Sequence, residues 1–529
     1  MKISNFLLNK VDNVLNNIPM YTVVLYSLIL TILVSFVESH LGFLPYTPKS
    51  LFISLFTALF VCIVTNIFFA KSLKLPLQFD SSLITALIIF LILLPVNNFL
   101  GIIPIVIASF LAIASKYILV LRNTHVFNPA AFGIFATTFL GYFFQSFAVA
   151  FWWVGSLYLL PITLVTGFFV VRKTRKHFLF FASISAGFLA SLFSSIVYGI
   201  NFLEALNFTF ISGPIIFFVT IMLTEPHTIT KNKSQQIFYG FLIILLPVFV
   251  SYFIQFNITP EFSLLIGNLI SFIISQRTRF ILKLKEIKKL NDDTFEYIFE
   301  NSEKTNKNFN FSAGEFMEWD LQHAKPDSRG MRRYFTISSC PNENQIAFAT
   351  KFPPKDESSF KKALKEMKLG DTIYATQLGG DFLLPESKNK NIIMIAGGIG
   401  ITPFISQLRD LLSQKQKIKD NLSIALFYCV RSAKDIVYND LLKKSIDELG
   451  LKVIYVVSDN SEDSEALKYN NSFYESGYIT KEILNKYTQN MHNEYYISGP
   501  NVMVEASKKI LLEAKNKIKN IHTDYFPGF

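Results

Sequence analysis

A glycine-rich turn (Gly397, Gly398 and Gly400) follows an apolar run and precedes an amphipathic stretch that opens with Thr402-Pro403. A strand, a glycine turn and a helix in this order let the backbone approach a pyrophosphate at the helix N-terminus. Free N–H groups and the helix dipole favour anions there. Many doubly wound folds use such a turn for packing alone. The segment is therefore a candidate dinucleotide site.

A second polar motif lies upstream of this turn and a third lies downstream. The upstream motif runs from Arg333 to Ser339 (RYFTISS), and the downstream motif runs from Ser498 to Pro500 (SGP). Short apolar runs separated by turns surround the upstream motif and predict a small antiparallel barrel. Farther along, apolar runs alternate with helical stretches, which predicts a parallel sheet covered by helices.

The three motifs in this order closely resemble the ferredoxin–NADP reductase family over residues 284–529. The resemblance implies an NAD(P)H-dependent oxidoreductase that contains FAD. In the family's pattern Arg333 would pair with the FAD pyrophosphate and Phe335 would pack on the isoalloxazine. The Thr336 hydroxyl would reach flavin N5, the atom that accepts hydride.

The same resemblance implies the remaining cofactor contacts. Ser338 would hold the edge of the flavin ring, and Ser358 or Ser359 would touch the pyrophosphate. A terminal aromatic residue, Phe529 or Phe526, would cover the flavin face, although packing on the sheet explains it equally well. The implied cofactor-binding residues are Arg333, Tyr334, Phe335, Thr336, Ile337, Ser338, Ser358, Ser359, Gly397, Gly398, Gly400, Thr402, Pro403, Arg431, Ser432, Gly499, Pro500 and Phe529.

One position departs from the family's usual residue, and two others leave the choice between NADH and NADPH open. The family often has a cysteine near the nicotinamide where this chain has Ser498. A hydroxyl can still donate a hydrogen bond, so we expect the rate of hydride transfer to be altered but not abolished. Thr336 and Ser498 are the predicted catalytic residues. Arg431 and Ser432 slightly favour NADPH over NADH, because they could bind its 2′-phosphate. Related NADH enzymes also carry an arginine nearby.

The first half of the chain, residues 20–276, is almost continuously apolar and aromatic. A hydrocarbon core of roughly 30 Å needs about 20 apolar residues per helix. Lys and Arg concentrate in alternate loops, which places both termini in the cytoplasm and makes the net charge of +11 a matter of topology, not a nucleic-acid surface. The ten predicted transmembrane helices lie near residues 20–37, 50–70, 81–97, 101–120, 128–146, 150–171, 178–199, 206–224, 237–256 and 262–277.

Haem and iron–sulfur clusters are not expected. The histidines of the apolar half lie at span ends or in loops, and no helix carries the pair that haem ligation needs. The chain has 3 cysteines, too few for an ordinary iron–sulfur cluster, and they form no zinc-type spacing. No metal site is predicted, and any redox cofactor should be organic.

Three polar groupings lie at the ends of apolar spans. Carboxylates, amides and hydroxyls at membrane depth are costly unless satisfied, so they indicate a binding site. Helix capping explains each grouping equally well, because Asp and Asn are good N-caps and proline suits a first helical turn. The groupings are Asp80-Ser81-Ser82 with Thr85, Asn128-Pro129, and Ser212-Gly213-Pro214 with Thr224-Glu225-Pro226.

The segments DSSLITAL, FNPAAFG and the Thr-Glu-Pro end strongly resemble the D subunit of the Rnf complex and the B subunit of the sodium-translocating NADH:quinone reductase. The resemblance implies a ten-span protein that holds flavin within the membrane. The family's covalent FMN hangs on a threonine in a Ser-Gly-Ala-Thr segment that this chain lacks, so noncovalent FMN or riboflavin is expected. The implied flavin-lining residues are Asp80, Ser82, Thr85, Asn128 and Glu225.

The sequence thus predicts a polytopic all-α membrane domain (residues 1–283), an antiparallel β-barrel FAD domain (284–385) and an α/β NAD(P)-binding domain (386–529). We expect a multi-pass protein of the cell membrane, surrounded by lipid, that passes electrons from NAD(P)H through FAD to the membrane flavin. The final acceptor stays open between a quinone and an external flavin, metal or redox partner protein. The alternatives are a flavin-binding or flavin-transporting module with an attached flavin reductase, and a passive anchor.

Overall fold

The computed structural model falls into two compact units, residues 1–278 and residues 279–529. It describes residues 11, 14–15, 18–73, 75, 77, 79–121, 124–144, 150–225, 228, 233–255, 258–275, 279–302, 311–324, 326–327, 330–352, 357–385, 391–414, 423–459, 469–488, 493–513 and 520–526.

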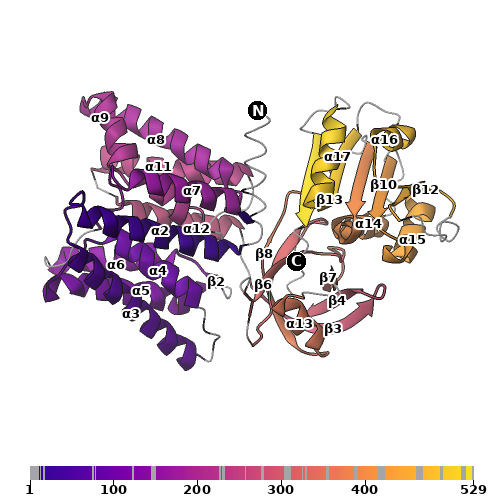
Figure 1. Ribbon diagram of the computed structural model, residues 1–529, viewed down its shortest axis with the longest axis horizontal. Coiled ribbons are helices and arrows are strands. Elements are labelled where there is room, and N and C mark those ends of the chain that lie inside the picture. Colours follow the sequence, from indigo (N-terminus) through magenta and orange to yellow (C-terminus); the bar gives the residue numbers. More distant parts are fainter. Residues whose placement is uncertain are drawn as a thin grey trace. The chain divides into compact units, whose positions relative to one another are not determined.

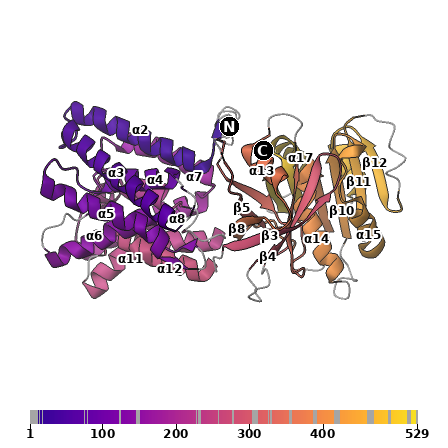
Figure 2. The same cartoon turned by 90° about the horizontal axis from the view of Figure 1, so that it is seen from below.

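The N-terminal unit is a bundle of helices that lie side by side in both views (Figures 1 and 2). Its helices are α2 (Met20–His40), α3 (Pro48–Ser72), α4 (Phe79–Ile92), α5 (Phe99–Ile118), α6 (Pro129–Phe144), α7 (Leu160–Thr174), α8 (His177–Tyr198), α9 (Phe202–Leu206), α10 (Ile215–Phe217), α11 (Lys233–Ile254) and α12 (Pro260–Ser275). Two π-helical turns, η1 (Asn207–Ile211) and η2 (Phe218–Met222), and a pair of two-residue strands, β1 (Val120–Leu121) and β2 (Thr124–His125), complete it.

Among the described residues, five helices are long and apolar enough to cross a membrane, namely α2, α3, α5, α8 and α11. A sixth is counted if the two segments around the 51° bend between Ile211 and Ile215 form one span. Each of the ten predicted spans contains helix, but α4, α6, α7 and α12 have only 14, 16, 15 and 16 residues. A ten-span membrane domain is therefore not confirmed.

The predicted span at 150–171 is wrong in its first part, because the helix begins only at Leu160. Residues 150–159 instead bind the C-terminal end of α4. The backbone N–H groups of Phe151 and Trp152 donate to the Ile92 carbonyl oxygen at 3.1 and 2.8 Å. The Trp153 indole N–H donates to the Phe90 carbonyl oxygen at 2.7 Å. An irregular segment thus satisfies carbonyl groups that the end of a helix leaves free.

The C-terminal unit begins with an antiparallel half-barrel, called the barrel below, which is a six-stranded sheet in which every neighbouring pair is antiparallel. The strand order is β6-β5-β8-β3-β4-β7. Aromatic rings fill its core, among them Trp319 and Phe348 with ring centroids 4.5 Å apart. The elements are β3 (Phe280–Lys289), β4 (Thr294–Asn301), β5 (Phe316–Asp320), β6 (Arg332–Thr336), β7 (Ile346–Lys351), α13 (Ser359–Glu366) and β8 (Thr372–Gly379).

A second six-stranded sheet, entirely parallel, follows in the order β12-β11-β10-β9-β13-β14. Side chains of β9 alternate between two buried clusters: Met394 packs with Phe404 of α14, and Ile395 packs with Val504 of α17. This explains the continuous apolar run of β9, since a parallel strand is covered on both faces. The elements are β9 (Asn391–Gly397), η3 (Gly398–Ile401), α14 (Thr402–Ser413), β10 (Ser423–Val430), η4 (Ala433–Asp435), α15 (Asn439–Leu449), β11 (Lys452–Val457), β12 (Ser472–Ser476), α16 (Lys481–Tyr487), β13 (Asn493–Pro500), α17 (Asn501–Glu513) and β14 (Ile521–Phe526).

Candidate functional site

The two motifs expected to hold the nicotinamide dinucleotide meet at one edge of the parallel sheet. Gly397 ends β9, and Ser498 lies near the end of β13, which pairs directly with β9. The strand order reverses between β9 and β13. In open parallel sheets, ligands bind in the crevice at the carboxyl ends of the strands at such a point.

Close packing explains why the turn needs glycine. A Cβ on Gly400 would lie 2.5 Å from the Ser498 carbonyl oxygen and 2.6 Å from Gly499 Cα. A side chain on Gly397 would overlap the Met503 sulfur. Gly398 has φ +53°, a left-handed conformation that favours glycine. Gly397 and Gly400 thus serve close packing, whereas a Cβ added to Gly398 would meet nothing within 4 Å, so the backbone is open to a diphosphate at Gly398.

Other predicted residues of this site are engaged with their own elements. The Thr402 hydroxyl donates to the Ile399 carbonyl oxygen at 3.1 Å, and Pro403 occupies the first turn of α14. The Ser432 side chain caps η4 in a capping box with Asp435. Arg431 is 81% exposed and pairs with Asp459 at 3.1 Å. The arrangement around Arg431 thus contains an acid as well as a base, and it selects neither NADH nor NADPH.

Ser498, one of the two predicted catalytic residues, is fully buried. Its hydroxyl has no hydrogen-bond partner among the described residues. Leaving a buried hydroxyl unsatisfied costs about 1–3 kcal/mol, so such a group needs a reason. The position at the switch point makes the nicotinamide a candidate partner. Its catalytic role stays a prediction.

Arg333 and Ser359, both predicted for the FAD pyrophosphate, come together through a third residue, Asp327. Arg333 Nη2 lies 3.3 Å from Asp327 Oδ1, and the Ser359 backbone N–H donates to Asp327 Oδ2 at 3.0 Å. The Arg333 guanidinium also lies over the ring of Phe360, 5.4 Å from its centroid. An arginine beside the N-terminus of α13 fits a diphosphate.

Two serines at this helix end have different partners. The Ser358 side chain is the N-cap of α13 and accepts from the Lys361 backbone N–H at 3.3 Å. The Ser359 hydroxyl accepts from the Asp327 backbone N–H at 2.9 Å and lies 2.9 Å from His323 Nε2. No motif in the sequence indicated Asp327 or His323, because both lie in the connection between β5 and β6.

The two aromatic residues of the flavin motif lie on opposite sides of β6. The Phe335 ring stacks on Phe348 with centroids 4.5 Å apart and lies 5.8 Å from Phe360, within the core of the barrel. Tyr334 is 50% exposed and touches Phe316 edge-on. The Phe335 ring is partly exposed and its flavin contact stays a prediction, whereas the Tyr334 ring is the more exposed of the two. Thr336, which follows, is buried at 5% exposure, and Ile337 is fully buried in the barrel core.

Ser338, which is expected to hold the edge of the flavin ring, has its hydroxyl bonded within the protein, and its flavin contact stays a prediction. Its hydroxyl is buried and donates to Glu296 Oε1 at 2.6 Å. Arg409 of α14 binds the same carboxylate and also donates to the Ser338 carbonyl oxygen at 2.8 Å. The Tyr438 hydroxyl donates to Glu296 Oε1 at 2.9 Å. Ser338 is thus used to join the barrel to the parallel-sheet domain. Phe529 lies outside the described residues.

In the N-terminal unit the structure brings three of the five predicted flavin residues to one pocket. Thr85, Asn128 and Glu225 all line it, and its cavity has a volume of about 50 Å³. Asn128 Nδ2 donates to Glu225 Oε2 at 2.6 Å. The Asn128 side chain also accepts from the Ala131 backbone N–H at 3.0 Å, so it caps α6 as well. Asn128 can therefore cap α6 and line the pocket at the same time.

The other two predicted residues, Asp80 and Ser82, are not among those that line this pocket. Asp80 is exposed in the first turn of α4. Ser82 is buried, and its hydroxyl donates to the Phe79 carbonyl oxygen at 2.9 Å. One helical position later or earlier changes the face of a helix by about 100°. Ser81 lines the pocket instead, and Lys116 Nζ donates to its hydroxyl at 3.0 Å.

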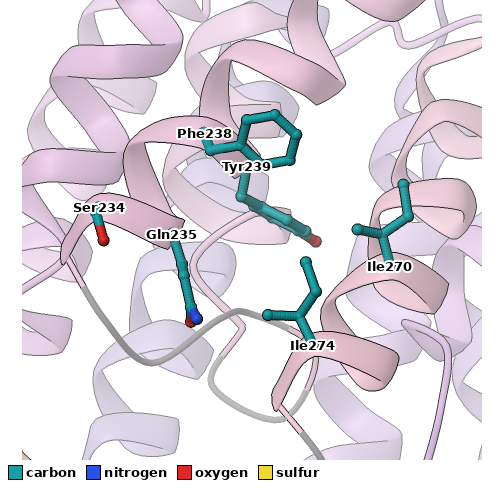
Figure 3. A pocket seen from close by; sticks show the side chains of 6 residues that line it. All are labelled: Ser234, Gln235, Phe238, Tyr239, Ile270 and Ile274. Carbon is teal, nitrogen blue, oxygen red and sulfur yellow. The ribbon is translucent and has the colours of Figure 1, made fainter.

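A second pocket lies between α11 and α12, with mainly apolar walls (Figure 3). The Tyr239 hydroxyl accepts from Asn268 Nδ2 at 2.8 Å. Asn268 Oδ1 in turn accepts from the Asn128 backbone N–H at 2.8 Å. Asn268 is fully buried and ties α6, α11 and α12 together. The sequence could have indicated Asn268, because an amide side chain within an apolar helix suggests a buried polar contact, but no motif in the sequence analysis includes it. The residues lining the second pocket are Ser234, Gln235, Phe238, Tyr239, Ile270 and Ile274.

One known family model matches part of the parallel-sheet domain. Residues 394–509 match the oxidoreductase NAD-binding domain. The C-terminal unit is similar to the flavohemoprotein of Bacillus subtilis, at 24% identity over 219 residues, covering 41% of this chain and 51% of that protein. It is also similar to a component of the Na(+)-translocating NADH-quinone reductase of Histophilus somni, at 26% identity over 245 residues, covering 42% of this chain and 56% of that protein.

A third relative, NADH-cytochrome b5 reductase 1 of Aspergillus terreus, is 26% identical over 184 residues, which are 34% of this chain and 59% of that protein. Among solved structures, ferredoxin-NADP+ reductase from Plasmodium falciparum is 21% identical with a TM-score of 0.37, covering 47% of this chain and 97% of that one. The chain thus spans between half and three fifths of the length of the three curated relatives. Those three relatives confirm the prediction that the C-terminal unit is an NAD(P)H-dependent FAD oxidoreductase module.

Proposed function

We propose that the whole chain is a membrane-bound NAD(P)H oxidoreductase that passes electrons through FAD to a second flavin in the N-terminal unit. From there the electrons reach a quinone or an acceptor across the membrane. The alternate placement of basic loops supports an orientation with the reductase unit in the cytoplasm. Covalent continuity would keep donor and acceptor at a high effective concentration.

One observation carries the reductase part of this proposal. The segment that follows Thr336 is bonded directly to the helix that follows the glycine turn. The Ser406 hydroxyl donates to the Ser339 carbonyl oxygen at 2.7 Å, and Arg409 donates to the Ser338 carbonyl oxygen. Ser406 and Arg409 both belong to α14. The flavin motif and the dinucleotide motif are therefore held together by short, buried bonds.

Different residues of the C-terminal unit would bind FAD, bind the nicotinamide dinucleotide and orient the two rings for hydride transfer. A bound FAD supplies the ring nitrogen that accepts hydride from the nicotinamide. Arg333 and the N-terminus of α13 would bind the FAD diphosphate, and the Thr336 hydroxyl would donate a hydrogen bond to the ring. The glycine turn would hold the dinucleotide at the switch point, with Ser498 near the nicotinamide. Burial of Ser338, Ser339 and Ser406 would fix the approach of the two rings.

In the N-terminal unit, the pocket with Thr85, Asn128 and Glu225 is the proposed site of a noncovalent FMN or riboflavin, and its cavity of about 50 Å³ has to widen to admit the ring. Amide, hydroxyl and carboxylate groups can bind the polar edge of a flavin ring, and the apolar wall of Ile84 and Ile88 can cover its face. The contact of Asn128 with Glu225 would pre-organise these groups. This pocket also argues against a passive anchor.

Anaerobic reduction of the purified full-length protein tests the proposal. The expected result is that excess NADH or NADPH bleaches the absorbance of two noncovalent flavins, one fast and one slower. Because both flavins are chemically extractable, FAD and a second flavin should appear in equal amounts after acid treatment. Absence of any flavin bleached by either nicotinamide would overturn the reductase function. Bleaching of FAD alone would overturn only the membrane relay.

A further inference from the structure

The donors assigned to the FAD diphosphate already bind a carboxylate of the same chain. Asp327 Oδ2 accepts from the Ser359 backbone N–H at 3.0 Å, at the first turn of α13. Asp327 Oδ1 lies 3.3 Å from Arg333 Nη2. A diphosphate would use the same two kinds of donor, a helix N-terminal N–H and an arginine fork. An internal anion therefore stands where the cofactor's anion would bind.

The Asp327 contact is built from both directions. Its backbone N–H donates to the Ser359 hydroxyl at 2.9 Å, so Asp327 and Ser359 bind each other reciprocally. His323 Nε2 lies 2.9 Å from the same hydroxyl, while His323 Nδ1 lies 2.8 Å from the Leu321 carbonyl oxygen. These bonds hold the connection between β5 and β6 against the N-terminus of α13. The carboxylate is placed by the fold and is not a solvated side chain that happens to point this way.

Arg333 can turn from one anion to another at modest cost. Its Nη1 donates to the carbonyl oxygens of Gly330 and Arg332 at 3.1 and 2.7 Å, and these bonds do not depend on Asp327. The Arg333 side chain is 10% exposed and that of Asp327 is 25% exposed. The pair is partly open to solvent on the Asp327 side, and its longer N–O distance of 3.3 Å is that of a single contact, so a ligand with two phosphates can compete with it.

We propose that Asp327 is a selectivity residue for the flavin, because its carboxylate competes with the flavin phosphates for Arg333 and the N-terminus of α13. This inference rests on the proposed binding of FAD to the C-terminal unit. A flavin with a diphosphate offers enough charge to displace Asp327, whereas an isoalloxazine without phosphate leaves the internal contact in place. Because of this carboxylate, only a flavin with enough negative charge to displace Asp327 can bind to Arg333 and the N-terminus of α13.

The test compares flavin binding in the full-length protein before and after the charge is removed. Asp327→Asn keeps the size of the side chain and an oxygen that can accept from Ser359, and it removes only the negative charge. Flavin-stripped protein in detergent is titrated with FAD, and binding is followed by quenching of flavin fluorescence. Riboflavin, which has no phosphate, is the matched control ligand. Every protein in the test also carries Glu225→Gln, so that the flavin site proposed for the N-terminal unit binds neither ligand. Asp292→Asn is the matched control variant, because that fully exposed acid pairs with Lys289 on the surface of the same unit.

The expected result is an FAD dissociation constant about tenfold lower in Asp327→Asn, the effect of one like charge near a partly exposed site. Riboflavin binding should change less than about twofold by the same reasoning. Asp292→Asn should match the parent chain for both ligands. An FAD affinity in Asp327→Asn that is unchanged or weaker would overturn the inference, as would equal gains for FAD and riboflavin.

A second variant keeps the test decisive if the first one folds poorly. Asp327→Ala removes the charge and the contact with Ser359 together, and it should also strengthen FAD binding. Weaker FAD binding in a folded Asp327→Ala protein would mean that Asp327 positions the site and does not compete for it. No FAD binding in the parent chain or in any variant would instead contradict the proposed function itself, which separates the two failures.

Discussion

Glu296 and Arg409 form a buried ion pair that joins the barrel to the parallel-sheet domain. Arg409 Nη1 and Nη2 lie 3.1 and 3.3 Å from the two carboxylate oxygens of Glu296, whose side chain is 1% exposed. Ser338 and Tyr438 donate to the same carboxylate. Tyr438 adopts a left-handed backbone conformation with φ +61°, which is uncommon for a side chain of this size. The fold therefore holds a strained residue in order to complete this contact.

The first prediction concerns the stability that this pair provides. Arg409→Ala leaves the Glu296 carboxylate buried without its ion partner, which should cost about 3–5 kcal/mol. Arg431→Ala is the matched control, because the Arg431–Asp459 pair is 81% and 54% exposed and should be worth less than about 1 kcal/mol. Thermal unfolding of the full-length protein measures both. Equal shifts of the melting temperature in the two variants would contradict the prediction.

The second prediction concerns acid. Burial raises the pKa of the Glu296 carboxyl, but the Arg409 charge and the hydrogen bonds from Arg409, Ser338 and Tyr438 outweigh burial and hold the pKa below its ordinary value. A carboxyl whose pKa is lower in the folded state stabilises the fold above the unfolded value of about 4.3, and this contribution is lost as the pH falls through the folded value. Melting temperatures measured from about pH 5 down to about pH 3 should therefore fall more steeply for the parent chain than for Glu296→Gln. Parallel curves would refute this.

The motifs of the C-terminal unit could be predicted from the sequence because each is local. The strand, the glycine turn and the helix around Gly400 follow one another in the chain, and so do the residues of β6. The Glu296–Arg409 pair could not be predicted, since it joins residues more than a hundred positions apart. Asp327 could not be predicted because it lies in the connection between β5 and β6, outside the motifs. The family resemblance predicts Asp80 and Ser82 in the flavin site. The rotation of side chains around α4 brings Ser81 and Thr85 to the pocket, and Asp80 and Ser82 are not among the residues that line it.

The third prediction separates the two aromatic residues of the flavin motif. Phe335 stacks on Phe348 against the barrel core and is partly buried, so Phe335→Ala should cost about 2–3 kcal/mol of stability, less than for a fully buried ring. Tyr334 is half exposed, so Tyr334→Ala should change stability by about 1 kcal/mol or less. If Tyr334 is the ring that packs on the flavin, Tyr334→Ala weakens FAD binding in a fluorescence titration. Loss of FAD affinity only in Phe335→Ala would restore the role that the family pattern implies for Phe335.

The fourth prediction concerns Ser498. Ser498→Ala removes a buried hydroxyl that has no partner among the described residues, so it should not lower the melting temperature. If the hydroxyl serves the nicotinamide, the rate at which NADH or NADPH bleaches the flavin should fall about tenfold, the value of one neutral hydrogen bond made in the transition state. Ser498→Cys, which restores the family's usual residue, should keep more of this rate. Stopped-flow absorbance without oxygen makes the measurement, and an unchanged rate in Ser498→Ala would exclude the catalytic role.

The last prediction concerns the flavin of the N-terminal unit. Asn128 and Glu225 line the pocket and bind each other at 2.6 Å, whereas Asp80 is exposed and is not among the lining residues. Asn128→Ala or Glu225→Gln should therefore remove one of two acid-extractable flavins per chain, because each breaks the polar wall of the pocket. Asp80→Ala is the control and should retain both flavins. The measurement is the amount and identity of flavin released from purified protein. A single FAD that survives every one of these changes would leave the pocket without a flavin, and the electrons would then have to leave the reductase unit by another route.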